Sequence, residues 1–185
     1  MENKTPFMTE IPEQEPQRQQ YFMAHAKEQL HILEENLGRP LTCCINTFGC
    51  QMNARDSEKL LGILETIGYQ AVETEDADFV LYNTCTVREN ANLRVYGRLG
   101  QLGARKKKHP HMMIALCGCM MQEKEVVEKI KKTYRFVDLI FGTHNIFKLA
   151  ELVSLCLEER LEELEAQGRE DKKPKHKMVV DVWKD

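Results

Sequence analysis

Residues 41–53 read LTCCINTFGCQMN, residues 79–91 read FVLYNTCTVRENA, and residues 112–119 read MMIALCGC. Each segment begins with a short apolar run that suits a buried strand, and each continues into a polar, turn-forming stretch. A buried strand that leads through a turn into a helix is the repeating unit of an open parallel sheet. We therefore expect all three segments to contribute strands to one such sheet.

Amphipathic stretches separate these runs from one another and from two further runs at 69–72 and 136–141. The predicted helices each carry one apolar face and lie at 21–37, 56–67, 88–102, 121–130 and from about residue 144 onward. Asn53 could cap the second of them. Right-handed crossovers place helices on both faces of a parallel sheet. The predicted fold class is α/β, a doubly wound parallel sheet of about five strands in a three-layer, flavodoxin- or Rossmann-like arrangement.

Composition predicts three parts along the chain. Residues 1–40 are expected to form an arm with one helix, because their first half is rich in Gln, Glu and Pro and poor in aliphatic residues. Residues 41–157 hold the alternating pattern of the sheet domain. Residues 158–185 contain the end of the last helix, a charged linker at 168–177 and one more apolar run, so we expect another domain to begin there.

Size, charge and cysteine content narrow the class of protein. The 185 residues carry a formal net charge of -3, which neither favours nor excludes a nucleic-acid partner. No apolar run is long enough for a signal or membrane segment, so we expect a cytoplasmic protein with no membrane contact. Seven cysteines in such a chain indicate a metal, redox or buried role better than a disulfide framework.

Cys50, Cys85 and Cys119 each lie just after a predicted strand and before a predicted helix. In an open parallel sheet all such turns meet at the carboxyl edge, where ligands bind. The helix that follows each cysteine directs its positive end toward that edge and favours the thiolate. Glycine precedes two of the three. Three thiolates on one edge are the ligands that an iron-sulfur cluster requires.

The other cysteines have simpler interpretations. Cys43 and Cys44 lie within a strand and Cys156 lies on an apolar helix face, so we expect all three to fill the core. Cys117 is ambiguous, because it precedes Cys119 by two positions and could be the fourth thiolate of a structural zinc site in an interaction module. A flavodoxin-like nucleotide binder is a third hypothesis, although the turns lack a Gly-rich phosphate loop.

The motifs at residues 46–53, 83–91 and 117–119 together resemble the N-terminal domain of the radical-SAM methylthiotransferases, over about residues 41–157. The resemblance implies that Cys50, Cys85 and Cys119 ligate an auxiliary 4Fe-4S cluster that carries or donates sulfur. It also implies S-adenosylmethionine and a second 4Fe-4S cluster in a separate radical-SAM domain of the full-length protein, and an RNA-binding domain beyond it.

The family has branches with different substrates. Residues 51–53 and 87–89 are most similar to the branch that adds a methylthio group to carbon 2 of isopentenyladenosine beside the tRNA anticodon. The alternatives are threonylcarbamoyl-adenosine and an aspartate of a ribosomal protein. No C-x-x-x-C-x-x-C motif occurs in these 185 residues, so we expect the chain alone to be inactive.

Polar residues near the cysteines have two interpretations. Arg88 and Asn53 are candidate contacts to the cluster rim or to RNA, and Arg94 and Arg98 follow on the same predicted helix as Arg88. The basic run 105–108 could contact phosphates, although a solvated helix end is the favoured interpretation. Asn46, Asn53 and Asn83 are expected to bond to backbone rather than to substrate, and no histidine is assigned a role.

Overall fold

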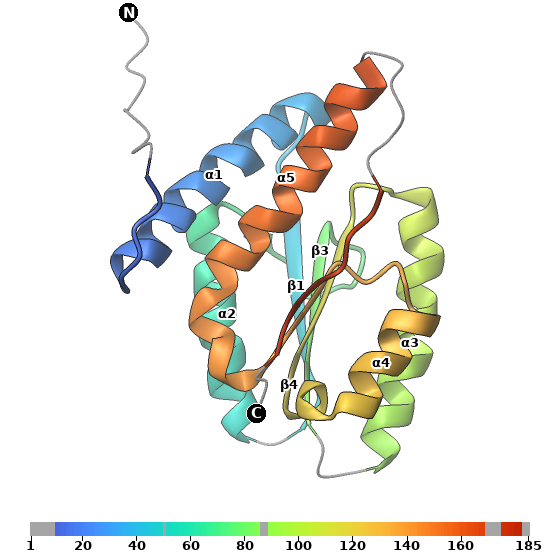
Figure 1. Cartoon of the computed structure of the whole chain (residues 1–185). Helices are drawn as coiled ribbons and strands as arrows, with labels where there is room; N and C mark the ends of the chain where they lie inside the picture. Colours follow the sequence, from blue (N-terminus) through green and yellow to red (C-terminus); the bar gives the residue numbers. More distant parts are fainter. Residues whose placement is uncertain (1–9, 50, 86–88, 169–174, 183–185) are drawn as a thin grey trace, which may run out of the picture.

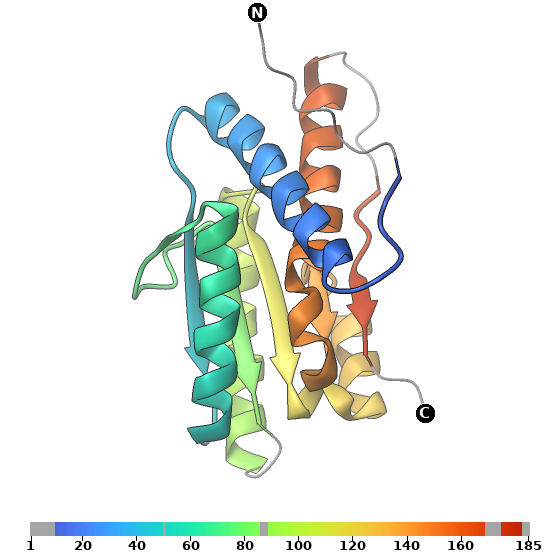
Figure 2. The same cartoon turned by 90° about the vertical axis from the view of Figure 1, so that its left-hand side faces the viewer.

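A computed structural model of the chain describes residues 10–49, 51–85, 89–168 and 175–182. These residues form a six-stranded sheet in which all neighbouring strands are parallel. Helices cover both faces of the sheet (Figure 1 and Figure 2). The predicted doubly wound α/β class is confirmed, with one strand more than expected.

The strand order explains where a site can form. Across the sheet the strands are β2 (Gln70–Ala71), β1 (Thr42–Thr47), β3 (Phe79–Thr84), β4 (Met113–Gly118), β5 (Leu139–Phe141) and β6 (Val179–Asp181). The chain runs outward from β1 to β2 and then returns past β1 to β3, so the direction of strand addition reverses between β1 and β3. A crevice at the carboxyl edge of such a reversal is the usual binding place of open α/β sheets.

The helices divide between the two faces. One face carries α1 (Gln17–Leu37), α2 (Gln51–Ile67) and α5 (Leu149–Gly168), and the other carries α3 (Glu89–Lys108) and α4 (Lys124–Thr133). Short 3₁₀ helices, η1 (Cys119–Gln122) and η2 (Thr143–Lys148), follow β4 and β5. Among the described helices none is sufficiently long and apolar to cross a membrane.

Two apolar cores lie on either side of the sheet. Strand residues alternate between them: Cys43 and Leu81 pack toward α2 and α5, whereas Cys44 and Val80 pack toward α3 and α4. All positions of β3 and β4 are buried, which accounts for the apolar runs in both strands, and β3 ends in two buried polar residues, Asn83 and Thr84.

Helix α1 belongs to the body of the domain. Its Phe22 and Leu30 are buried in the core shared with α2 and α5. The Ser154 hydroxyl of α5 donates to Gln29 Oε1 at 2.7 Å, and Arg18 pairs with Glu151 at 2.5 Å. These contacts hold helix α1 on the sheet domain.

The structure corrects one predicted boundary and gives the last apolar run a partner strand. Helix α2 begins at Gln51 instead of residue 56, so Asn53 lies within its first turn and does not cap it. Within the last apolar run, Val179–Asp181 form β6, which pairs with β5 through Leu139 and Val179. The apolar pattern alone predicts a strand here but not its partner, because a linker separates it from β5 in the sequence.

Candidate metal centre at the carboxyl edge

The predicted cysteine turns lie at the switch point of the sheet. Cys85 directly follows β3, and Cys119 opens η1 directly after β4. Cys50 lies outside the described residues, but its neighbour Gly49 lies between β1 and α2, and its other neighbour, Gln51, begins α2. The predicted topology therefore holds for the turns: they follow β1, β3 and β4, which are adjacent strands.

Gly49 brings the first turn against the second. Its φ of +142° is a conformation that L side chains rarely adopt. A Cβ at this position would lie 2.4 Å from the Cβ of Cys85 and 3.2 Å from its Sγ. The backbone next to residue 50 thus contacts the Cys85 side chain directly, at a distance that only glycine permits.

Gly118 brings the third turn against the second. Its φ is +100°, and a Cβ there would lie 2.1 Å from the backbone oxygen of Thr84 and 2.6 Å from its nitrogen. The Thr84 hydroxyl donates to the backbone oxygen of Cys117 at 2.6 Å. The backbone before Cys119 is consequently fixed against the backbone before Cys85.

Buried amides connect the start of α2 to the end of β3. Asn53 Nδ2 donates to the backbone oxygen of Thr84 at 2.9 Å, and Asn83 Nδ2 donates to the backbone oxygen of Asn53 at 2.8 Å. Asn83 Nδ2 also donates to Ser57 Oγ at 3.0 Å. Both amides are buried, with 6% of Asn53 and 1% of Asn83 exposed. This exchange holds the helix after the first turn against the strand before the second.

An aromatic cluster supports the first turn from the α3 face. The Arg98 guanidinium lies 5.3 Å from the ring centroid of Phe48 and 5.5 Å from that of Tyr82. Arg98 also pairs with Glu75, and Glu75 accepts from Tyr82 Oη at 2.8 Å. Since Phe48 directly precedes Gly49, Arg98 braces the first turn and is already engaged within the domain.

The remaining described cysteines lie in the core. Cys43, Cys44, Cys117 and Cys156 are at most 3% exposed. Burial raises the pKa of the Cys43 thiol to about 12 and also raises the pKa of Cys44, Cys117 and Cys156. Cys117 packs among the apolar residues shared with α2 and α5. Cys119 is partly exposed and Cys85 is 5% exposed at the sheet edge.

The described residues alone do not form a complete metal site. Within 10–49, 51–85, 89–168 and 175–182, no group of three or more His, Cys, Asp or Glu side chains could hold a metal ion. Two of the three predicted ligands are described and Cys50 is not. The thiols on two adjacent turns fit the donor set of an iron-sulfur cluster. Glycine backbone allows the turns to approach one another where a Cβ would fill the space.

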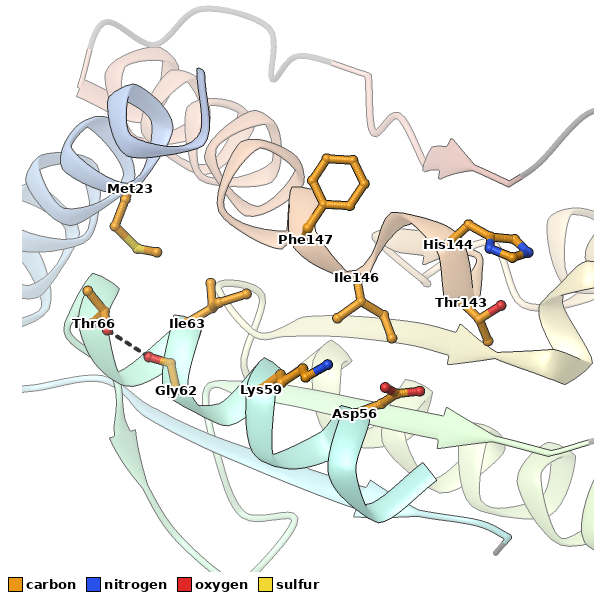
Figure 3. A pocket seen from close by; sticks show the side chains of 10 residues that line it. All are labelled: Met23, Asp56, Lys59, Gly62, Ile63, Thr66, Thr143, His144, Ile146 and Phe147. Atoms are coloured by element: carbon orange, nitrogen blue, oxygen red, sulfur yellow. Dashed lines mark hydrogen bonds between the residues drawn. The ribbon is translucent and has the colours of Figure 1, made fainter. Parts of the chain in front are cut away.

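An open groove of about 680 Å³ lies beside this edge, between α2 and η2 (Figure 3). Met23, Ile63 and Phe147 give it an apolar lining, and Phe147 is 50% exposed. Gln122 Nε2 donates at 3.4 Å to Thr143 Oγ1 at the groove's rim. Because Gln122 belongs to η1, the groove adjoins the turn of Cys119, but its lining contains no cysteine.

The cationic side chains that were predicted as possible contacts to the cluster rim or to RNA lie in different environments. Arg88 lies outside the described residues, and Arg94 is exposed on α3. Of the basic run, Arg105 pairs with Asp76, and Lys106 Nζ is 2.8 Å from Asp138. This run ends α3 at the amino edge of the sheet, opposite the cysteines, as the next strand begins at Met113. The prediction that this run forms a solvated helix end was wrong for Lys106, whose side chain is only 13% exposed.

The fold and the edge define a class: a doubly wound α/β domain that presents cysteine-bearing turns at its switch point. The family model described as "Uncharacterized protein family UPF0004" matches residues 42–142. The chain belongs to this family, and the matched residues contain all three cysteine motifs.

Curated relatives carry one shared description. The chain is 63% identical over 163 residues to the tRNA-2-methylthio-N(6)-dimethylallyladenosine synthase of Lachnoclostridium phytofermentans, covering 88% of the chain and 32% of that protein. Proteins of the same description from Acetivibrio thermocellus and Clostridioides difficile are 50% and 44% identical, each over 94% of the chain and 33% of the relative. The predicted resemblance is confirmed, and the chain spans about a third of the length of these relatives.

Proposed function

We propose that this chain is the cluster-binding domain of a tRNA methylthiotransferase. The observation that carries the proposal is the contact among the turns that follow β1, β3 and β4, which places Cys85 and Cys119 at one edge with the first turn against Cys85. The relatives named as tRNA-2-methylthio-N(6)-dimethylallyladenosine synthases support the isopentenyladenosine branch. The modified atom would be carbon 2 of that nucleoside, next to the anticodon.

Cys50, Cys85 and Cys119 are the proposed ligands of an auxiliary 4Fe-4S cluster. Three thiolates on a four-iron cluster leave one iron open to a sulfur-containing ligand, which is the chemistry that the cluster would supply. The protein's part is to hold the three thiolates at a fixed separation. Gly49 and Gly118 permit the required backbone approach, and the amides of Asn53 and Asn83 fix the turns.

The remaining components of the reaction are proposed for the full-length protein. S-adenosylmethionine and a second 4Fe-4S cluster belong to a radical-SAM domain, and an RNA-binding domain contacts tRNA in the cytoplasm. The chain has no C-x-x-x-C-x-x-C motif for the second cluster. The 185 residues alone are accordingly proposed to be inactive in methylthiolation.

Two alternatives make different predictions. A zinc module needs Cys117 as fourth ligand, and the burial of this side chain in the core under α2 and α5 argues against it. Branches acting on threonylcarbamoyl-adenosine or a ribosomal protein share the same cluster domain, so they differ only in the substrate of the full-length enzyme.

Anaerobic reconstitution with iron and sulfide tests the proposal. We expect about four irons per chain and an electron paramagnetic resonance signal after reduction. Cys85→Ala should abolish binding of the three-ligand cluster, whereas Cys43→Ala, a thiol buried in the core, should leave it intact. Equal loss of cluster binding in both variants, or bound zinc without iron, would contradict the assignment.

A further inference from the structure

Asn83 contacts the segments that lead into and out of the cysteine turns. It lies in β3, two residues before Cys85, and its backbone oxygen accepts from Phe48 N at 2.7 Å. Its amide donates to the backbone oxygen of Asn53 and to Ser57 Oγ. A Cβ on Gly118 would lie 2.9 Å from Asn83 Oδ1. One residue therefore contacts the segments before and after position 50 and the backbone before Cys119.

These contacts form a single connected network in the interior. Asn53 Nδ2 donates to Thr84 O and lies 3.4 Å from Asn83 Oδ1, and Thr84 Oγ1 donates to Cys117 O. Thr84 is fully buried. A change in the orientation of the Asn83 amide would alter its distances to the first and third turns together.

We propose that Asn83 is a positioning residue that fixes the three cysteine turns relative to one another and thereby controls retention of the cluster. The proposal rests on the proposed function and extends it from the ligands to the group that holds them. Asparagine suits the position because one Nδ2 supplies two donors, for Asn53 O and Ser57 Oγ, while Oδ1 packs against Gly118. Leucine has a similar shape and supplies neither bond.

A second buried asparagine provides a matched control. Asn145 in η2 is 7% exposed and its Nδ2 donates to Asp181 O at 3.0 Å, which joins η2 to β6. It lies at the same edge of the sheet but contacts none of the cysteine turns through this bond. Replacing either amide by leucine removes a buried side-chain donor from a hydrogen bond to a backbone oxygen, which destabilises the fold.

The experiment compares Asn83→Leu and Asn145→Leu in the 185-residue chain. For each we would measure the urea midpoint without iron, the iron content after anaerobic reconstitution, the rate of iron release to a chelator, and the electron paramagnetic resonance spectrum of the reduced cluster. Both variants should lose stability. Only Asn83→Leu should release iron faster, by about tenfold to a hundredfold, and change the spectrum, because partners of metal ligands typically have effects of this size.

The outcomes separate the inference from the proposed function. If wild type binds about four irons and the two leucine variants release them at equal rates, the positioning role is overturned while the cluster assignment stands. If wild type binds no iron, both are overturned.

Should Asn83→Leu fail to fold, Ser57→Ala removes one of its partners at a half-buried position. We then expect faster iron release than from wild type with little change in the urea midpoint. An unchanged release rate would overturn the proposal.

Discussion

At the amino edge of the sheet, two buried aspartates precede β3 and β5 and pair with arginine and lysine side chains, whereas at the carboxyl edge neutral amides and a hydroxyl connect the cysteine turns to one another. Asp78 accepts from Arg39 at 2.7 and 2.8 Å, and Asp138 accepts from Arg160 at 2.6 Å and from Lys106 at 2.8 Å. Burial alone would raise the pKa of Asp78, but hydrogen bonds from Arg39 and His111 outweigh it and hold that pKa well below its ordinary value.

The two edges of the sheet are thus held by different kinds of interaction. Removing one partner of a buried ion pair strongly destabilises a fold, because the other charge is left buried and unpaired. The ion pairs at the amino edge therefore hold the strand and helix ends that meet there. The groups that connect the cysteine turns to one another, Asn53, Asn83 and Thr84, are uncharged. They connect the turns without adding a charge of their own beside the cysteine side chains.

The largest effect should come from Asp138→Asn. This change leaves Arg160, which is 3% exposed, and Lys106 without their buried counter-charge. We expect the free energy of unfolding to fall by about 3–5 kcal/mol, measured by urea denaturation. Glu128→Gln, which breaks an exposed pair with Lys131 at 3.7 Å, should change it by no more than about 0.5 kcal/mol. A loss below about 1 kcal/mol for Asp138→Asn would mean that the amino edge is not the stabilising region.

Gly118→Ala should produce the largest effect at the carboxyl edge. The new Cβ would collide with the Thr84 backbone in a conformation that alanine rarely adopts. We expect a loss of about 2 kcal/mol or more in the free energy of unfolding, together with reduced iron uptake.

Gly100→Ala is the control for this variant. No atom lies within 4 Å of a Cβ at this position in α3, so alanine should be neutral or stabilising by up to about 1 kcal/mol. Normal iron uptake in Gly118→Ala would contradict the close packing of the second and third turns.

Neighbouring lysines in the basic run sharpen the comparison on one helix. Lys106→Met removes a cation that donates to both Asp138 oxygens and to Phe136 O, and should cost about 2–3 kcal/mol. Lys107→Met removes an exposed side chain and should change stability by less than about 0.5 kcal/mol. Equal urea midpoints for the two variants would show that the buried pair does not contribute.

The sequence predicted the carboxyl edge better than the amino edge, for a physical reason. Strand, turn and helix are local patterns, so the positions of Cys85 and Cys119 could be predicted from short segments. The hydrogen-bond partners of the Asn83 and Asp138 side chains lie 22 or more residues away and depend on how the elements pack. No local pattern distinguishes an amide that bonds across two turns from one that faces solvent.

One missed feature did carry a signal. Val95, Leu99, Leu102 and Lys106 recur at helical spacing, and the first three are buried on the inner face of α3. Lys106 follows the same stripe, so its burial could have been predicted. Four consecutive cations favour a solvated helix end by their charge, but the apolar periodicity of α3 predicts a buried position for the second of them.

The smallest expected effect concerns His176, which tests whether the amino edge also holds β6. Its Nδ1 lies 2.7 Å from Glu159 and 3.8 Å from Asp138, and its Nε2 lies 3.2 Å from the backbone oxygen of Val137. The hydrogen bond to Glu159 raises the pKa of His176, against burial and against the nearby charge of Lys106.

Because the folded-state pKa is raised, the contribution of His176 to stability should be complete below the unfolded pKa of about 6.5 and be lost as pH rises through the folded value. His176→Ala should therefore cost about 1 kcal/mol at pH 6 and less above pH 8, measured by urea denaturation across this range. His31→Ala, at an exposed pair with Glu35, should cost less than about 0.5 kcal/mol throughout. If the loss of stability in His176→Ala does not depend on pH, the residue has a packing role. The charged network of the amino edge would then end at Glu159 and Asp138.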